Sequence, residues 1–142
     1  MSVIIYHNPA CETSRNTLGL IRNAGIEPTL VDYLRDPPDR ATLGRLISNA
    51  GLTVREAIRQ KGTPYLELEL DNPQLSDHQL LEAMLAHPIL INRPFVVAAA
   101  GVKLCRPSEL VLDILGEPQQ GAFTKEDGQH VIDVNGQQIH HE

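Results

Sequence analysis

The sequence places Cys11 where a thiol can act as a nucleophile. It follows an apolar, β-branched run at residues 3–6 and comes just before Thr13 and Ser14, either of which can cap a helix. At the start of a helix, unpaired backbone N–H groups and the helix dipole favour a negatively charged side chain. The pKa of a free cysteine is about 8.5, and such a position can lower it to between roughly 3.5 and 7.5. We therefore expect Cys11 to be a nucleophilic thiolate at neutral pH.

Ser14 stands three residues after Cys11, where a protein with a redox-active pair of thiols would carry its second cysteine. The site therefore has one thiol, and turnover of an oxidised or derivatised Cys11 needs a thiol from outside, such as a small cytosolic one. The hydroxyl or the backbone N–H of Ser14 can donate to the thiolate or to an anion. His7 precedes Cys11 by four residues, close enough to order the loop or to stabilise the thiolate.

Two arginines flank a predicted β-hairpin. Its strands are residues 95–98 and 102–105, and a turn near Ala100 sets an antiparallel register that brings Arg93 close to Arg106. Two guanidinium groups repel one another unless an anion lies between them, so the pair predicts an oxyanion site. By contrast, the local sequence around Arg59 indicates only that its charge complements the C-terminus of another helix.

The elements that position these residues follow from periodicity and turn residues. Residues 3–6 and 29–33 have the composition of strands and enclose a helical segment, which makes a βαβ unit. From 39 to 87, apolar residues recur with helical spacing and predict three helices, one of them opened by a capping box of Ser76 and Gln79.

After the hairpin, Pro107 is expected at the first position of a final helix. The order βαβ, helical block, ββα predicts an α/β fold with a thioredoxin-like mixed sheet and flanking helices. A doubly wound sheet is disfavoured, because residues 95–105 leave no room for a crossover helix.

We expect one domain over residues 1–142, with a helical insertion at about 36–88 and a polar C-terminal tail at about 117–142. Within the tail, the Asn135-Gly136 pair can close a small hairpin from Val131 to Ile139.

Composition narrows the classes of function. The net charge of −6 argues against nucleic acid or an anionic membrane as a partner, and no apolar run is long enough for a signal peptide or a membrane span. We therefore expect a cytoplasmic protein. The two cysteines, Cys11 and Cys105, lack the spacing of a metal site or a disulfide framework, and Cys105 within a strand favours a packing role.

Beyond these local features, the chain closely resembles the glutathione- and glutaredoxin-coupled arsenate reductases of bacteria in four strings: YHNPACETSRNTL, HPILINRPFVV, LCRPSELVLDIL and GAFTKEDG. The order and spacing of the strings match from about Val3 to Val134. The resemblance implies that Cys11 attacks arsenate to form a thiol-arsenate ester and that glutathione then gives a mixed intermediate. Glutaredoxin would complete the reduction to arsenite, with glutathione as a co-substrate and no bound cofactor or metal.

The same resemblance assigns roles to further residues. It implies that Arg59, Arg93 and Arg106 hold arsenate and that His7 and Ser14 support the thiolate. It also implies a cis peptide bond before Pro94, beside the active cysteine.

One departure is Glu12, since the family commonly has glycine directly after the cysteine. A carboxylate facing the site would repel arsenate and raise the pKa of the thiol, so we expect this side chain to turn to solvent.

Three other functions could use some of the same residues. A phosphatase of the protein tyrosine type separates its cysteine and arginine by five residues, whereas Arg15 follows Cys11 after only three. A non-catalytic thioredoxin-like regulator that binds RNA polymerase would not need three arginines around a thiol. A glutathione-dependent thiol transferase acting on another substrate stays open.

Overall fold

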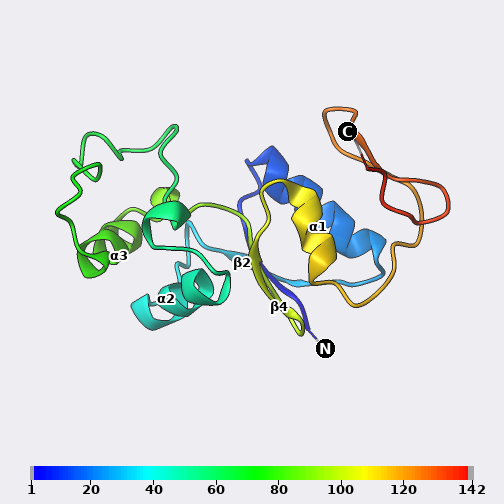
Figure 1. The fold of residues 1–142 in the computed structure, drawn as a ribbon, viewed down its shortest axis with the longest axis horizontal. Helices are drawn as coiled ribbons and strands as arrows, with labels where there is room; N and C mark the ends of the chain where they lie inside the picture. The colour runs from blue at the N-terminus through cyan, green and yellow to red at the C-terminus, as the bar shows by residue number, and fades with distance from the viewer. Residues whose placement is uncertain (1, 141–142) are drawn as a thin grey trace. The chain divides into compact units, whose positions relative to one another are not determined.

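A computed structural model describes residues 2–140, which divide into two units (Figure 1). The first unit holds the chain up to Val31 and again from Arg93 onward, and the second holds Asp32–Asn92. The second unit begins and ends near the limits predicted for the helical insertion. That the whole chain forms one domain stays a prediction.

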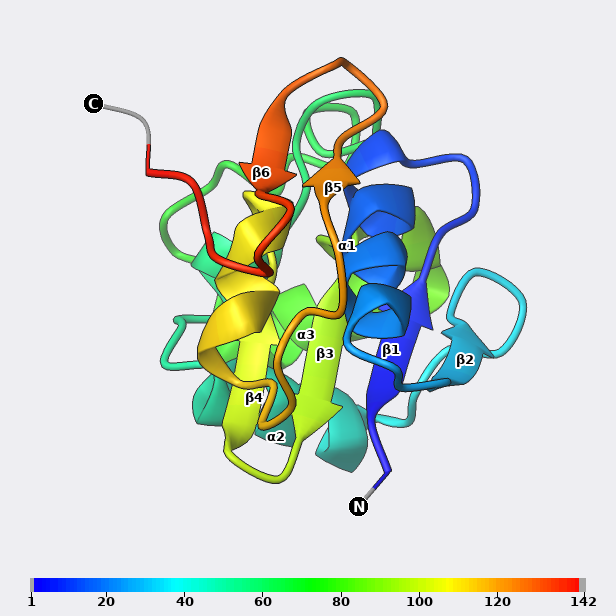
Figure 2. The same ribbon diagram turned by 90° about the vertical axis from the view of Figure 1, so that its right-hand side faces the viewer.

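The first unit is built on a four-stranded sheet in the order β2-β1-β3-β4 (Figure 2). Its strands are β1 (Ile4–His7), β2 (Thr29–Asp32), β3 (Phe95–Ala98) and β4 (Gly101–Leu104). Strand β3 is antiparallel to both β1 and β4, and the sheet is mixed, so β2 runs parallel to β1 as the βαβ pattern requires. The predicted thioredoxin-like mixed sheet is confirmed.

Two helical elements cover one face of this sheet, α1 (Glu12–Asn23) and the 3₁₀ helix η3 (Ser108–Asp113) (Figure 2). Leu20 and Ile21 of α1 are fully buried, and each contributes about 1.5–3 kcal/mol by leaving water. They pack in one cluster with residues of the sheet, of η3 and of the C-terminal segment (residues 117–140), and with Cys105, which follows β4: Ile5, Val96, Cys105, Val111, Val131 and Ile132. This cluster packs the C-terminal half of α1 onto the sheet, and the helix begins at Cys11.

Two helix starts differ from the prediction. Cys11 itself is the N-cap of α1, with no side-chain cap bond, so Thr13 and Ser14 lie inside the helix rather than before it. Pro107 precedes η3 as its N-cap instead of occupying the first helical position, and its peptide bond to Arg106 is cis.

The second unit contains the helices α2 (Arg40–Asn49) and α3 (Asp77–Ala86) and the short 3₁₀ helices η1 (Arg55–Ala57) and η2 (Pro88–Leu90). The capping box before α3 is present as predicted: Gln79 N donates to Ser76 Oγ at 3.2 Å, and Ser76 N donates to Gln79 Oε1 at 2.8 Å. The second of the three predicted helices is only the single turn of η1.

The C-terminal segment contains two short strands and a tight turn. Strands β5 (Phe123–Thr124) and β6 (His130–Ile132) pair antiparallel, a pairing that was not predicted from the sequence. The hairpin expected around Asn135-Gly136 is present: Ile139 N donates to Val131 O at 2.8 Å, and Gly136 has a φ of 79°. Val131 is only 2% exposed, so this segment completes the core.

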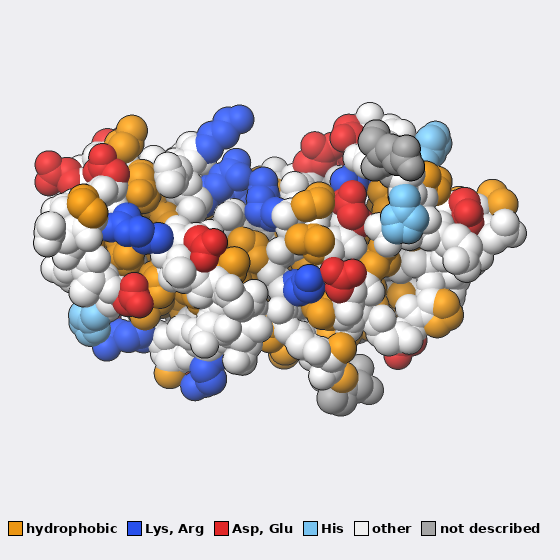
Figure 3. All heavy atoms as spheres, in the orientation of Figure 1, with side chains coloured by type: hydrophobic (Ala, Val, Ile, Leu, Met, Phe, Trp, Pro, Cys, Tyr) orange, Lys and Arg blue, Asp and Glu red, His pale blue; other side chains and the backbone are white. Residues whose placement is uncertain are grey.

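Among residues 2–140, no helix is long and apolar enough to cross a membrane. On the face drawn in Figure 3, Lys and Arg side chains are interspersed with Asp and Glu side chains.

Candidate active site

The loop between β1 and α1 holds Cys11 in place through backbone hydrogen bonds. Cys11 N donates to Asn8 O at 3.0 Å, and Arg15 N donates to Cys11 O at 3.0 Å as the first bond of the helix. The side chain of Asn8 accepts from Ala10 N at 2.9 Å, which closes the turn from within. The half-buried thiol therefore lies at the N-terminus of α1, as the sequence predicted.

Behind the thiol, Ser14 links the first helical turn to the end of β1. Its Oγ lies 2.6 Å from His7 Nδ1 and accepts from Asn8 N at 3.1 Å, and the residue is fully buried. The backbone N–H of Ser14 in turn faces the sulfur of Cys11. His7 and Ser14 thus lie next to the thiol loop, and their support of the thiolate stays a prediction.

The β3–β4 hairpin brings two arginines to the thiol. Phe95 pairs with Leu104, one residue from the predicted register, so Arg93 and Arg106 flank the same end of the hairpin. Arg106 Nη1 lies 3.9 Å from Cys11 Sγ and donates to Arg93 O at 3.0 Å. Arg93 also donates toward the sulfur. The peptide bond between Arg93 and Pro94 is cis, as expected.

These donors decide the charge of the thiol. Burial alone would raise the pKa of Cys11, but the backbone N–H of Ser14 and the guanidinium groups of Arg93 and Arg106 outweigh it and lower the pKa. The geometry therefore supplies a nucleophile together with cationic donors for an anion.

Glu12 and Arg15 lie on the outer side of the first helical turn. Glu12 is exposed, as expected for a carboxylate that turns to solvent. Arg15 Nη1 donates to Pro9 O at 2.8 Å, and its guanidinium forms two hydrogen bonds with Glu126 at 2.8 and 2.9 Å. The contact between Arg15 and Glu126 was not predicted from the sequence, although a spacing of four residues places Arg15 one helical turn from Cys11.

Arg59 belongs to the second unit, where it follows η1. Its backbone N donates to Leu90 O at 2.7 Å, and its Nε donates to Lys61 O at 3.2 Å. Its proposed contact with substrate stays a prediction.

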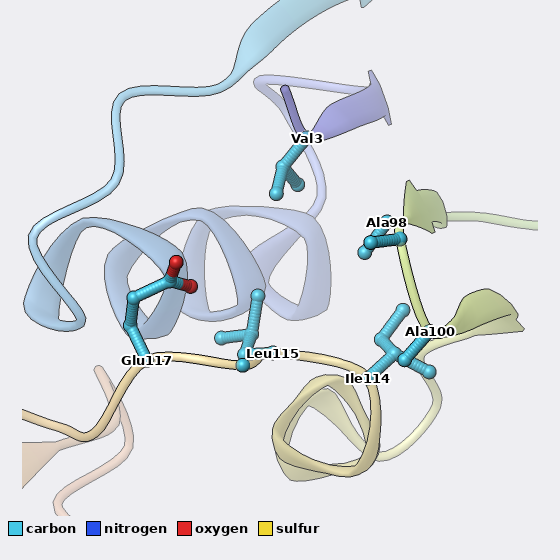
Figure 4. A pocket seen from close by; sticks show the side chains of 8 residues that line it. Val3, Ala98, Ala100, Ile114, Leu115 and Glu117 are labelled. Carbon is cyan, nitrogen blue, oxygen red and sulfur yellow. The ribbon is translucent and has the colours of Figure 1, made fainter. Parts of the chain in front are cut away.

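The described residues also form a small pocket at the far end of the sheet from Cys11 (Figure 4). It is lined mainly by apolar side chains, including Val3, Ala98 and Ile114, with Glu117 as its acidic group. It lacks cationic side chains that could bind an oxyanion. Among residues 2–140, no group of three or more His, Cys, Asp or Glu could hold a metal ion.

Comparisons with known proteins agree with this geometry. Residues 6–114 match the ArsC family. The chain belongs to the ArsC family. Arsenate reductase of Rhizobium meliloti (strain 1021) is 66% identical over 139 residues, covering 98% of this chain and 99% of the relative. Arsenate reductase of Escherichia coli (strain K12) is 53% identical over 138 residues, covering 97% of this chain and 98% of the relative.

A solved ArsC-type structure agrees in fold. Arsenate reductase from Vibrio cholerae superimposes with a TM-score of 0.77 at 48% identity, covering 81% of this chain and 98% of that protein. The resemblance recognised in the sequence is thereby confirmed.

Proposed function

We propose that this chain reduces arsenate to arsenite through covalent attack by Cys11, with glutathione and glutaredoxin as the source of electrons. The observation that carries the proposal is the half-buried thiol at the start of α1, whose pKa is lowered by the N–H of Ser14 and by Arg93 and Arg106 despite burial. Relatives that align over nearly the whole chain are named arsenate reductases.

Arginines provide the binding site for the substrate. Arsenate is a tetrahedral oxyanion, and guanidinium groups bind such anions through several fixed donors. Arg93 and Arg106 are already beside the sulfur, so an arsenate between them would lie within reach of the thiolate. Arg59 is the proposed third ligand of the anion, by its match to the family.

The reaction needs two electrons, because arsenic passes from oxidation state V to III. Cys11 first displaces an oxygen of arsenate, which leaves as water, and a glutathione thiol displaces a second oxygen in the same way. A glutaredoxin thiolate then attacks the glutathione sulfur. The bond between the glutathione sulfur and arsenic then breaks, and its electron pair stays on arsenic. Glutaredoxin and glutathione leave together as a mixed disulfide. Water releases arsenite from Cys11 and restores the thiol.

An external thiol is required because the protein offers no second reactive one among its described residues. The other cysteine, Cys105, is fully buried, and burial raises its pKa to about 12. Glutathione fits this need as a small cytosolic thiol, and a reaction that depends on it is expected in the cytoplasm. No resident cofactor is part of the proposal.

Phosphate is nearly isosteric with arsenate, so binding alone separates the two poorly. We expect selectivity to arise from the chemistry, because thiols reduce arsenic and do not reduce phosphorus. Phosphate should therefore act as a weak competitive inhibitor.

A thiol transferase acting on another substrate is the second candidate, since it too would use a single activated cysteine. The pair Arg93 and Arg106 favours the oxyanion, because a disulfide substrate carries no charge at the reacting sulfur. A regulator that binds RNA polymerase would have no use for the lowered pKa of Cys11.

Arsenite production separates these candidates. The purified chain is assayed with arsenate, glutathione and glutaredoxin, with each thiol component omitted in turn, and Cys11→Ser is compared with wild type. Production that needs both thiols and Cys11 supports the proposal. Disulfide exchange without arsenite would support the transferase, and inactivity toward both substrates would support the regulator.

A further inference from the structure

Residues 123–126 connect two elements that carry the site. The chain leading into β5 runs between α1 and η3 (Figure 2). The ring of Phe123 lies against Gly19 of α1, where an added Cβ would come within 2.7 Å of Phe123 Cε2. Only a residue without a side chain allows this approach, so the C-terminal segment is packed directly onto the helix that begins with Cys11.

Glu126 ties this segment to the first turn of α1. Its carboxylate accepts two hydrogen bonds from Arg15, and its backbone N donates to Oδ1 of the buried Asn16 at 3.1 Å. Arg15 also donates to Pro9 O in the loop that precedes Cys11. The carboxylate of Glu126 is therefore connected, through the guanidinium of Arg15, to the backbone carbonyl of Pro9, two residues before Cys11.

Lys125 ties the same segment to η3. Its Nζ lies 2.8 Å from Glu109 Oε1, and the two side chains are only 11% and 20% exposed. Glu109 is three residues after Arg106, in the element that the chain enters directly after that arginine. Lys125 and Glu126 are adjacent in the chain and contact two different elements. Glu126 binds the first turn of α1, which begins at Cys11, and Lys125 binds η3, which follows Arg106.

We propose that Lys125 and Glu126 are positioning residues, which hold the start of α1 and the start of η3 so that Arg106 Nη1 stays within contact distance of Cys11 Sγ. Both lie outside the stretch 6–114 that defines the family match. The inference rests on the proposed role of Cys11 as the nucleophile, and it assigns to the C-terminal segment a part in activating that residue.

A loss of positioning can be distinguished from the direct electrostatic effect of removing the Glu126 charge, because the two change the reactivity of Cys11 in opposite directions. Arg93 and Arg106 face the thiol from the hairpin, and Arg15 and Glu12 flank it on α1, while His7 faces it through Ser14. Removing the negative charge of Glu126 would by itself favour the thiolate and speed its reactions. Loss of positioning has the opposite sign, because it weakens the donors on the sulfur.

The test measures the rate of alkylation of Cys11 by iodoacetamide as a function of pH, with the modified residue located by mass spectrometry. Variants are Glu126→Gln, Lys125→Met and the double variant. The ion pair between Arg15 and Glu126 is exposed, and such pairs change an equilibrium by about twofold to fivefold, so we expect Glu126→Gln to slow alkylation near neutral pH by that factor. Lys125→Met should slow it at least as much, because it leaves the mostly buried carboxylate of Glu109 without its partner. The apparent pKa should rise and the double variant should be slower still.

Two variants serve as controls. Arg22 and Glu27 form the same two-bonded ion pair at the other end of α1, so Glu27→Gln should leave both alkylation and arsenate reduction unchanged. Lys125→Arg keeps the charge opposite Glu109 and should restore the wild-type profile. Faster alkylation in Glu126→Gln would overturn the proposal, as would an unchanged pH profile accompanied by a lower melting temperature.

Alkylation needs no arsenate, so this result is independent of the proposed reaction. If wild type produces no arsenite while Glu126→Gln still slows alkylation of Cys11, the proposed function fails and the positioning role remains. Steady-state kinetics complete the comparison: kcat should fall because positioning acts on the nucleophile, and KM for arsenate should rise because Arg106 also belongs to the proposed binding site.

Discussion

Cys11 and Cys105 carry the same side chain in the same unit, yet their surroundings drive their pKa values in opposite directions. Burial raises the pKa of both thiols. At Cys11 the backbone N–H of Ser14 and two guanidinium groups reverse that effect, whereas at Cys105 burial dominates over the nearby Lys103 and the pKa reaches about 12. Donors positioned by the fold, rather than exposure alone, decide which sulfur is reactive.

Replacing each cysteine gives the largest expected contrast. Cys11→Ser should lower kcat for arsenate reduction by about 10³-fold or more, because the hydroxyl is a far weaker nucleophile at pH 7. Cys105→Ala should keep kcat within about twofold of wild type, since that sulfur only packs in the core. Comparable losses in the two variants would contradict the separation of roles.

Removing a donor from the reactive thiol should give the next largest effect. Arg106→Gln should lower kcat/KM by roughly 100-fold to 1,000-fold, the size found when one preorganised oxyanion donor is lost. It should also raise the pKa of Cys11, measured from the pH dependence of alkylation. Arg106→Lys keeps the charge but loses the planar set of guanidinium donors that can bind an oxyanion at two points, so it should recover activity only in part. A full recovery would show that charge alone suffices.

The two thiols should also affect stability with opposite signs as the pH rises. Folded Cys105 keeps its proton up to a pKa of about 12, whereas the unfolded chain loses it near 9.0. Stability is therefore lost as the pH rises above about 9, at about 1.4 kcal/mol per pH unit for that single proton. Cys11 has a lowered pKa, so the stability that its thiolate adds to the folded state is complete above pH 9.0. That stability is lost as the pH falls through the pKa of Cys11 in the folded protein.

Urea unfolding of wild type and Cys105→Ala from pH 8 to pH 10 measures this effect. The difference in unfolding free energy between the two proteins should shrink as the pH rises, since other titrating groups are common to both. A difference that does not change with pH would mean that the buried thiol ionises as easily as an exposed one.

The smallest change is expected at Glu12, which adjoins the reactive cysteine in sequence but is exposed. Glu12→Gly should alter the pKa of Cys11 and the KM for arsenate by less than about twofold, because water screens an exposed charge. Glu12→Gln separates loss of charge from the helix-weakening effect of glycine. A large gain in arsenate affinity in both variants would mean that this carboxylate hinders the site.

Local patterns in the sequence determined where the thiol lies and which arginines approach it. The run at residues 3–6 and the Asn8-Pro9 turn set the start of α1, because strand, turn and helix propensities act over a few residues. The hairpin placed Arg93 opposite Arg106 because a tight turn sets the register of both strands. The match to the ArsC family added the expectation for Arg59, which no local pattern provided.

Only the tertiary structure decided what surrounds these residues. The contact of Arg15 with Glu126 joins residues 111 positions apart, and no periodicity reports such a pair. The burial that raises the pKa of Cys105 depends on α1, η3 and the C-terminal segment packing together around the sheet. Secondary structure follows from neighbours in the chain, whereas desolvation and ion pairing depend on neighbours in space, and these are brought together only by burial of the shared core.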